Sequence, residues 1–451
     1  MKTPDGTRSD PGNQPSAISP ESRVLSPLLS TQDPALGTRL SPQSSVPGPA
    51  VPRRFSVLKI APTFFFADYG CHVRILEEIK VLQGMGHQMV LCTYPSGDDL
   101  PGIDIRRATV GPWKPGVKVG PARRKYYLDT LLGFRSTQVA LQVRPDIVHT
   151  HLHDGAMIGY PVSRLARVPM VFDFQGSLTG EMIDHGFLSP RSLMYRPFRM
   201  LEKVINRMAD AIITSTANSA GILMKQFGCP ADRIFAVPDC VNTDMFAPRW
   251  LRERRNGHAD ELDALRRRLG VPEGHKVVVY LGLLQEYQGI SHLLRAAKEV
   301  AGRHLDVHFL IMGFPGLEKY QNMADELGIS NRVTFTGRVR YAEAPLHLAL
   351  GDVAVSPKMS ETEGNGKLLN YMAMGLPTVT FDTPVSREIL GDLGIFARTG
   401  DHSALAAEIE AVLFDDGSAR SLGESLRERA VRVYSWRQGG ELIQKVYESL
   451  V

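Results

Sequence analysis

The side chains best suited to chemistry in this chain lie together in one short loop, within residues 356–382. The loop holds two carboxylates, Glu361 and Glu363, and two glycines, Gly364 and Gly366. Glycines let the backbone approach a ligand closely, and carboxylates accept hydrogen bonds from hydroxyl groups. These residue types therefore suit a loop that lies against a ligand rich in hydroxyl groups.

The elements on either side of this loop predict a strand–loop–helix–strand unit. The apolar run Val353–Val355 predicts a buried strand, and a helical pattern begins near Lys367 and stops at Gly375. A second apolar run, Thr378–Phe381, predicts the next strand, which completes one βαβ unit. A helix N-terminus offers unpaired N–H groups and the positive end of a dipole, which suit phosphate. A phosphate site next to carboxylates that accept hydrogen bonds from hydroxyl groups indicates that the ligand is a sugar nucleotide. The simpler alternative is a polar turn that opens a surface helix.

The residues of this unit also carry a resemblance to a known family. Glu363-Gly364 and the run Tyr371–Val379 resemble the E-G-x-G…E-A-M-A-x-G-x-P-V signature of the family 4 retaining glycosyltransferases. The resemblance implies the GT-B fold and two glutamates, one near the transferred sugar and one on the ribose hydroxyls. At the second position this chain has Asn370, whose amide can also bind a hydroxyl. We assign Glu363 to the sugar as a catalytic residue and keep Glu361 as the alternative.

The same resemblance implies a donor site shared with two earlier glycine turns. The family's G-R-L-x-x-x-K-G motif corresponds to residues 282–289, where Leu283 and Gln288 replace the Arg and Lys that grip a diphosphate. We expect Lys367, at the helix start, to supply the missing charge, with Lys358 as the second choice. The expected donor-binding residues are Gly282, Gly313, Lys358, Glu361, Gly364, Asn365, Gly366, Lys367, Leu368 and Asn370.

The first half of the chain opens with a pattern typical of a doubly wound sheet. Val57–Ile60 predicts a strand, a loop with Gly70 follows, and an amphipathic helix leads to a second strand at Met89–Leu91. By its position, Gly70 corresponds to the loop that faces the cleft in GT-B transferases. We therefore place Gly70 on the acceptor side.

Three histidines alternate after the next predicted strand. His149, His151 and His153 follow Asp146, in a run that resembles the family's D-[IV]-[IV]-H-x-H element. The resemblance implies that one histidine lies near the sugar, and we take His151 as catalytic. Alternation along a strand would place all three on one face, as a metal site requires. We favour no metal and no cofactor, because the family's chemistry needs neither.

Residues 113–127 combine basic and aromatic side chains. Such a segment can dock on an anionic membrane surface, and it can equally be a solvated basic face. The residues concerned are Trp113, Lys114, Lys118, Arg123, Arg124, Lys125, Tyr126 and Tyr127.

Length, charge and cysteine usage limit the remaining choices. The 451 residues suffice for two or three domains, and a net charge of +4 argues against a dedicated nucleic-acid binder. The four cysteines lack metal-ligand spacing, which favours a reducing compartment. No apolar run is long enough to span a membrane, and the N-terminus has no secretory pattern. We expect a cytoplasmic protein, either free or peripheral on the inner face of the membrane.

Together these patterns predict an α/β protein with two Rossmann-like doubly wound domains facing across a cleft, the GT-B arrangement. We expect a disordered tail at 1–54, an acceptor domain at 55–240, a nucleotide-sugar domain at 241–430 and a terminal helix at 431–451 that packs back on the first domain.

The resemblance implies a metal-independent reaction with retention of anomeric configuration. A sugar would pass from a nucleotide diphosphate sugar to a hydroxyl of a glycan or a lipid-linked acceptor, without involvement of nucleic acid. A degenerate GT-B binding protein without transfer activity and a nucleotide-sugar epimerase are the alternatives.

Overall fold

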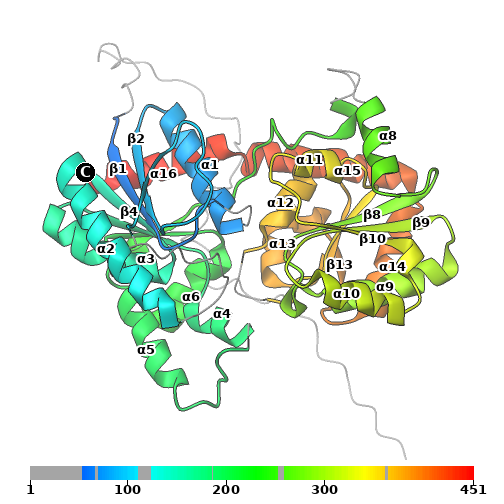
Figure 1. The fold of residues 1–451 in the computed structure, drawn as a ribbon, viewed down its shortest axis with the longest axis horizontal. Coiled ribbons are helices and arrows are strands. Elements are labelled where there is room, and N and C mark those ends of the chain that lie inside the picture. Colours follow the sequence, from blue (N-terminus) through cyan, green and yellow to red (C-terminus); the bar gives the residue numbers. More distant parts are fainter. Residues whose placement is uncertain (1–52, 67–69, 110–122, 185, 252–258, 361–363) are drawn as a thin grey trace, which may run out of the picture. The chain divides into compact units, whose positions relative to one another are not determined.

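The described part of the chain forms two β-sheets, each built of parallel strands and covered by helices (Figure 1). This confirms the predicted fold class. The predicted tail lies outside the described residues, apart from Arg53 and Arg54. The computed structural model describes residues 53–66, 70–109, 123–184, 186–251, 259–360 and 364–451.

The first sheet has seven strands in the order β3-β2-β1-β4-β5-β6-β7, and every neighbouring pair is parallel. Its strands are β1 (Ser56–Ala61), β2 (Gln88–Thr93), β3 (Asp104–Arg107), β4 (Ile147–His151), β5 (Met170–Phe174), β6 (Ala211–Thr214) and β7 (Ile234–Ala236). The helices between them are α1 (Gly70–Gly84), α2 (Arg123–Val143), α3 (Leu152–Ala166), α4 (Leu178–Asp184), α5 (Tyr195–Ile205), α6 (Ala217–Phe227) and the 3₁₀ turn η3 (Ala231–Arg233).

The second sheet has six strands in the order β10-β9-β8-β11-β12-β13, again parallel throughout. Its strands are β8 (Lys276–Leu281), β9 (Val307–Met312), β10 (Val333–Gly337), β11 (Val353–Ser356), β12 (Thr378–Phe381) and β13 (Ile395–Ala397). Its helices are α8 (Ala259–Arg268), α9 (Ile290–Arg303), α10 (Leu317–Glu326), α11 (Ala344–Leu348), α12 (Gly366–Ala373), α13 (Pro384–Leu390), α14 (His402–Leu413) and α15 (Asp416–Val433). Short 3₁₀ turns are η4 (Glu286–Gln288), η5 (Ser330–Arg332) and η6 (Gly391–Leu393).

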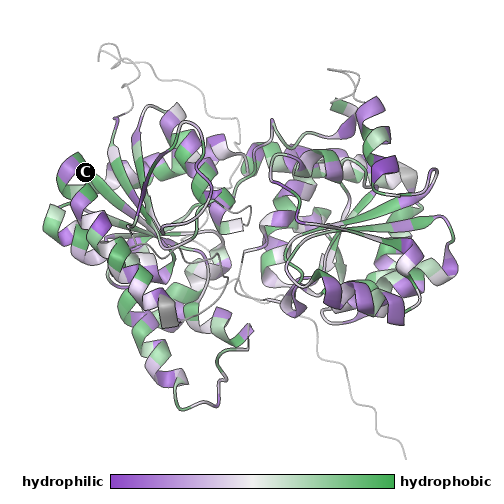
Figure 2. Ribbon diagram, in the orientation of Figure 1, coloured by the Kyte–Doolittle hydropathy of each residue, from purple (hydrophilic) through white to green (hydrophobic). Residues whose placement is uncertain are grey.

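Alternate side chains of each central strand enter two different cores. In β8, Val277 and Val279 pack into one core, while Val278 and Tyr280 pack into the other. Because both faces of a parallel sheet are covered by helices, its strands are continuous apolar runs. Figure 2 shows these strands as hydrophobic segments within more polar surroundings.

Each sheet changes strand order at one place. In the first sheet the order reverses between β1 and β4, and in the second between β8 and β11. Loops that leave the carboxyl ends of such neighbouring strands run to opposite faces of the sheet and leave room for a ligand between them. The motif loop predicted above follows β11, and the G-L-L-Q-E-Y-Q-G segment follows β8.

The terminal helix α16 (Trp436–Leu450) packs against α1. Ile443, Val446 and Tyr447 of α16 share a buried core with strand β1. The Tyr447 hydroxyl and Nδ1 of His149 share a hydrogen bond of 2.7 Å. The predicted domain limits themselves stay a prediction. No helix in the described part of the chain is both long and apolar enough to cross a membrane.

We expect Tyr447→Phe to lower the free energy of unfolding by about 1–3 kcal/mol, because the buried His149 nitrogen loses its partner. Tyr447→Ala should cost about 3–5 kcal/mol, because it also opens a cavity. Thermal unfolding followed by circular dichroism measures both, with Tyr127→Phe at the surface as the control. Unchanged unfolding of Tyr447→Ala would contradict the packing of α16.

Candidate functional site

Two loops meet at the carboxyl ends of β8 and β11. Gly289 has a φ of 77°, and a Cβ at this position would lie 1.9 Å from the carbonyl oxygen of Pro357, so only glycine fits. The Met359 N–H donates to the Tyr287 carbonyl at 3.0 Å. The two segments that sequence analysis assigned to the donor therefore pack backbone against backbone at the point where the strand order reverses.

The Lys367 ammonium lies between these two loops. It donates a hydrogen bond to the side-chain oxygen of Gln288 and lies 3.3 Å from the Tyr280 hydroxyl. It is also 4.7 Å from the centre of the Tyr280 ring, a cation–π contact. A Cβ at Gly282 would lie only 3.0 Å from Lys367 Nζ, so the charge sits directly over the Gly282 backbone. The Lys367 ammonium therefore contacts Gln288, the residue at the position where the family motif has its lysine.

The start of α12 is held by polar contacts from within the same loop. Asn365 is the N-cap residue, is buried, and accepts a hydrogen bond of 3.2 Å from the Ser356 hydroxyl through its side-chain oxygen. The buried Lys358 ammonium donates to the Gly364 carbonyl at 2.7 Å. Lys358 therefore contacts the backbone just before α12, whereas Lys367 reaches the neighbouring loop.

The remaining predicted donor residues have varied positions. The Leu368 side chain belongs to the apolar core, and its N–H donates to the Asn365 carbonyl at 3.0 Å. Asn370 is half-buried on α12, one turn beyond the helix start. The Gly313 N–H donates to the Gly337 carbonyl at 2.9 Å, beside the same sheet edge. Glu361 and Glu363 lie outside the described residues. On the acceptor side, Gly70 is exposed and forms the first residue of α1.

A fully buried network of charges lies at the corresponding edge of the first sheet. Lys59 of β1 forms an ion pair with Glu78 of α1, and its ammonium lies 3.2 Å from His151 Nε2. His151 Nδ1 donates to Asp173 at 2.9 Å, and Arg74 donates to the same carboxylate at 2.9 and 3.0 Å. His151 is 0% exposed and both of its ring nitrogens have partners. Its predicted contact with the sugar stays a proposal and requires Asp173 or Lys59 to move.

Burial and charge together fix the protonation of this network. Burial, followed by the Lys59 charge, holds the pKa of His149 well below its ordinary value and lowers the pKa of His151. Burial by itself would raise the pKa of Asp173, but Arg74 and His151 outweigh it and hold that pKa well below the usual range. Both histidines are therefore neutral and Asp173 is ionised at neutral pH.

This network also contains the side chains that could bind a metal. His153 is not part of it, because its ring packs 5.3 and 5.4 Å from those of Phe172 and Phe174. The cations Lys59 and Arg74 already pair with Glu78 and Asp173, and Arg74 also pairs with Asp239, so a divalent ion would have to sit beside two cations. The absence of a metal stays a prediction. The four side chains whose ligand atoms lie within 4.8 Å of one another are Glu78, His149, His151 and Asp173.

Sequence reasoning missed the residues that position these groups. Tyr280 and Gln288 were not recognised as partners of Lys367, because contacts between loops distant in sequence leave no local pattern. For the charge network a signal existed. Lys59 interrupts an otherwise apolar strand, and a charged residue in a buried strand demands buried partners.

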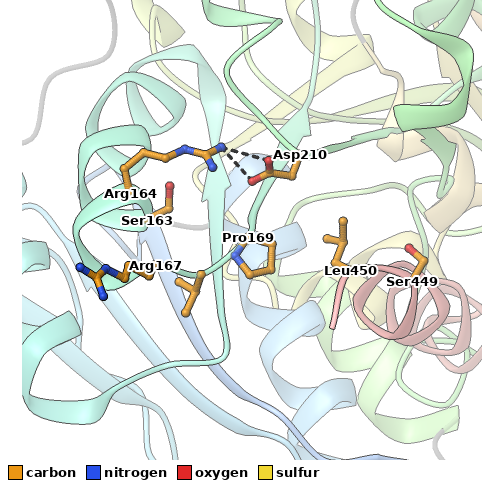
Figure 3. A pocket seen from close by; sticks show the side chains of 8 residues that line it. Ser163, Arg164, Arg167, Pro169, Asp210, Ser449 and Leu450 are labelled. Carbon is orange, nitrogen blue, oxygen red and sulfur yellow. Dashed lines mark hydrogen bonds and ion pairs between the residues drawn. The ribbon is translucent and has the colours of Figure 1, made fainter.

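A hollow lies at the amino-terminal ends of β5 and β6, beside the end of α16 (Figure 3). One of its two arginines, Arg164, is already bound by Asp210, whose two carboxylate oxygens are each 3.0 Å away. Ligands of doubly wound sheets bind at the opposite, carboxyl ends of the strands. This favours the carboxyl edges of the two sheets as the candidate site, the first edge holding Asp173 and the second Lys367.

Comparisons with known proteins agree with this geometry. Residues 262–429 match the family model described as glycosyl transferases group 1, and residues 70–245 match that of glycosyltransferase family 4. The D-inositol 3-phosphate glycosyltransferase of Corynebacterium jeikeium is 26% identical over 365 residues, covering 78% of this chain and 83% of the relative. The alpha-D-kanosaminyltransferase of Streptomyces kanamyceticus is 25% identical over 420 residues, covering 89% and 96%.

Solved structures show the same fold. Sucrose-phosphate synthase from Thermosynechococcus elongatus superimposes with a TM-score of 0.72 at 17% identity, covering 88% of this chain and 99% of that one. Anabaena HepE in complex with UDP and glucose gives a TM-score of 0.71 at 17% identity, covering 88% and 100%. The fold and the motif loops thus define a GT-B glycosyltransferase.

The two family matches together extend over most of the described residues, and the chain belongs to the group 1, or family 4, glycosyltransferases. It is an enzyme of the class that transfers a sugar from a nucleotide sugar. The predicted family and enzyme class are confirmed.

The neutral buried histidines predict an acid-sensitive fold. In the unfolded chain a histidine takes up a proton near its ordinary pKa of 6.5, whereas the buried ring does not. The free energy of unfolding should therefore fall as the pH drops below that value, by up to about 1.4 kcal/mol per pH unit for each such histidine. His149→Gln should reduce this slope between pH 7 and pH 5, as measured by the thermal midpoint. The control His402→Gln, at the surface, should keep the wild-type slope. Equal slopes in wild type and His149→Gln would show that His149 is protonated in the fold.

Proposed function

We propose that this enzyme is a retaining, metal-independent glycosyltransferase that uses a nucleotide diphosphate sugar and transfers the sugar to a hydroxyl of a glycan or a lipid-linked acceptor. The observation that carries the proposal is the Lys367 ammonium, held over the Gly282 backbone where the loops after β8 and β11 meet. A cation at that point, next to the start of α12, stabilises the charge of a departing diphosphate.

The donor would lie at the carboxyl edge of the second sheet. Gly282 and Gly313 would border the nucleotide, Gly364–Leu368 would face the diphosphate through the backbone, and Asn370 would bind a ribose hydroxyl. Anabaena HepE was solved with UDP-glucose, and a starch synthase of this fold with ADP, which supports a nucleotide diphosphate sugar as donor. Glu363 would position the transferred sugar, with Glu361 as the alternative.

Two cations supply the positive charge in place of a metal in this proposal. Lys367 would contact the diphosphate, and Lys358 would hold the Gly364 carbonyl in place so that the glycine-rich turn keeps its shape. On the first sheet, His151 and Asp173 would orient the sugar or acceptor once the network opens. Retention of configuration follows from the family resemblance, and the product's anomeric signal in NMR would test it.

The proposed location is the cytoplasm. The four cysteines are unpaired in the structure, which supports a reducing compartment. A peripheral membrane contact through residues 113–127 falls mostly outside the described residues. Its described aromatics, Tyr126 and Tyr127, are exposed.

Calorimetric titration with UDP, GDP, ADP and CDP tests the donor site. We expect one of the four to bind at micromolar strength, which is about −8 kcal/mol. Lys367→Ala should weaken that binding about tenfold or more, because a charged hydrogen-bond donor is lost. Lys298→Ala, an exposed lysine on α9, is the matched control and should bind normally. If no nucleotide binds, the chain is the degenerate binding protein. If one binds and the product is an epimer of the donor, it is the epimerase.

A charge exchange tests the role of Lys367 more sharply. If Lys367 replaces the lysine missing at position 288, the double variant Lys367→Ala/Gln288→Lys should regain most of the nucleotide affinity that Lys367→Ala loses. The single variant Gln288→Lys would place two ammonium groups together and should not bind more tightly. Failure of the double variant to regain affinity would show that a lysine at position 288 cannot take over the role of Lys367.

Turnover separates the two glutamates. Glu363→Ala should lower kcat by about a hundredfold or more while nucleotide affinity is retained, because the lost interaction is made in the transition state. Glu361→Ala should have a smaller effect. The reverse order would assign the sugar to Glu361.

A further inference from the structure

Helix α5 presents an apolar stripe to solvent. Pro197, Met200, Leu201 and Val204 are spaced i, i+3, i+4 and i+7 along it, and all four are exposed. Met200 is 63% exposed and Val204 49%. An apolar stripe at this spacing normally faces the core. Here Glu202 of the same helix faces inward instead, fully buried.

The inward Glu202 explains why the stripe points outward. Its carboxylate accepts hydrogen bonds from the Ser177 hydroxyl at 2.8 Å and from the N–H groups of Leu178 and Thr179 at 3.0 Å each. These contacts anchor α5 to the start of α4 through its polar side. The rotation of α5 is thereby fixed with the apolar stripe in solvent.

The segment before α5 also exposes apolar side chains. Leu193 is 94% exposed and Met194 is 52% exposed, immediately before the helix begins. We call residues 191–207, with the outward side chains of α5, the α5 face. It lies at the lower left of the ribbon in Figure 1, and Figure 2 shows hydrophobic residues along it.

Basic residues lie among these apolar side chains between residues 191 and 207, and exposed acidic residues are absent from that range. The sole acid between residues 191 and 207 is the buried Glu202. Within the described part of the chain, none of Arg191, Arg196 and Lys203 forms an ion pair. The five basic residues of the α5 face are Arg191, Arg196, Arg199, Lys203 and Arg207.

We propose that the α5 face docks on an anionic phospholipid membrane. Exposed apolar side chains with interspersed cations are the combination that binds the interface of such a bilayer. A symmetric dimer through this face would bring two sets of five cations together, which repels. The docking is peripheral, and it does not depend on transfer activity or on residues 113–127.

Sedimentation of the full-length chain with vesicles tests the proposal. We expect the chain to pellet with phosphatidylcholine vesicles that contain about 30% phosphatidylglycerol and to stay in solution with pure phosphatidylcholine. Salt at about 0.5 M should weaken the binding, because it screens the charges.

Two groups of variants separate the contributions of charge and apolar contact. Arg191→Gln/Arg196→Gln/Lys203→Gln should lower the partition coefficient about a hundredfold, since each cation near an anionic surface contributes about fivefold. Leu193→Ser/Met200→Ser/Val204→Ser should lower it at least about tenfold. All six positions are on the surface, so the fold should persist. Circular dichroism and nucleotide binding would verify this.

Matched controls keep the result specific. Arg267→Gln/Arg268→Gln/Leu305→Ser removes exposed residues of the same types from the second domain and should bind vesicles like wild type. The proposal is overturned if wild type stays in solution with anionic vesicles. It is also overturned if the α5-face variants pellet like wild type while Lys114→Gln/Lys118→Gln does not, which would assign binding to residues 113–127. Loss of a dimer in the α5-face variants without vesicle binding would assign the face to a second copy.

Discussion

The proposed donor site is built around one ammonium group held between two loops. Lys367 extends from the first turn of α12 to the side chains of Gln288 and Tyr280 in the segment that includes β8 and η4. A flexible lysine in solvent would lose side-chain entropy on binding a ligand, whereas one already held by a hydrogen bond and an aromatic ring loses less. The backbone contact between Gly289 and Pro357 sets the distance between the loops, so the position of the charge follows from the backbone.

The charged groups at the carboxyl edges of the two sheets are arranged differently. The second sheet keeps the Lys367 cation beside the Gly282 backbone and the Gln288 side chain. The first sheet buries Lys59 and Arg74 against Glu78 and Asp173 beside two neutral histidines, and Arg74 also pairs with Asp239. Buried ion networks of this kind contribute little net stability but impose one arrangement on the elements that supply them. Here they tie β1, β4, β5 and α1 at the edge where a substrate would lie.

Much of the fold could be read from the sequence, because parallel strands buried on both faces are continuous apolar runs. The βαβ unit around the motif loop was predicted almost to the residue. Its strand was expected at 353–355 and lies at Val353–Ser356, and its helix was expected near Lys367 and begins at Gly366. Lys367 was expected, from its place at the helix start, to supply charge in place of the Arg and Lys missing at 283 and 288, and this stays a prediction. The partners Gln288 and Tyr280 could not be predicted, since they are about eighty residues away in sequence and near only in the fold. The network of Lys59, Arg74 and Asp173 was missed for the same reason, and it buries His151, which was expected to face the sugar.

The position of α16 has a consequence for how the chain is made. Ile443, Val446 and Tyr447 complete a core whose other members include Val57 and Ile79. While the ribosome synthesises the chain, almost four hundred residues separate the first strand from the helix that covers it. This core of the first domain therefore cannot close during translation until α16 leaves the exit tunnel. During that interval the nascent chain is a natural client for chaperones, and a stop codon before α16 would damage the domain made first.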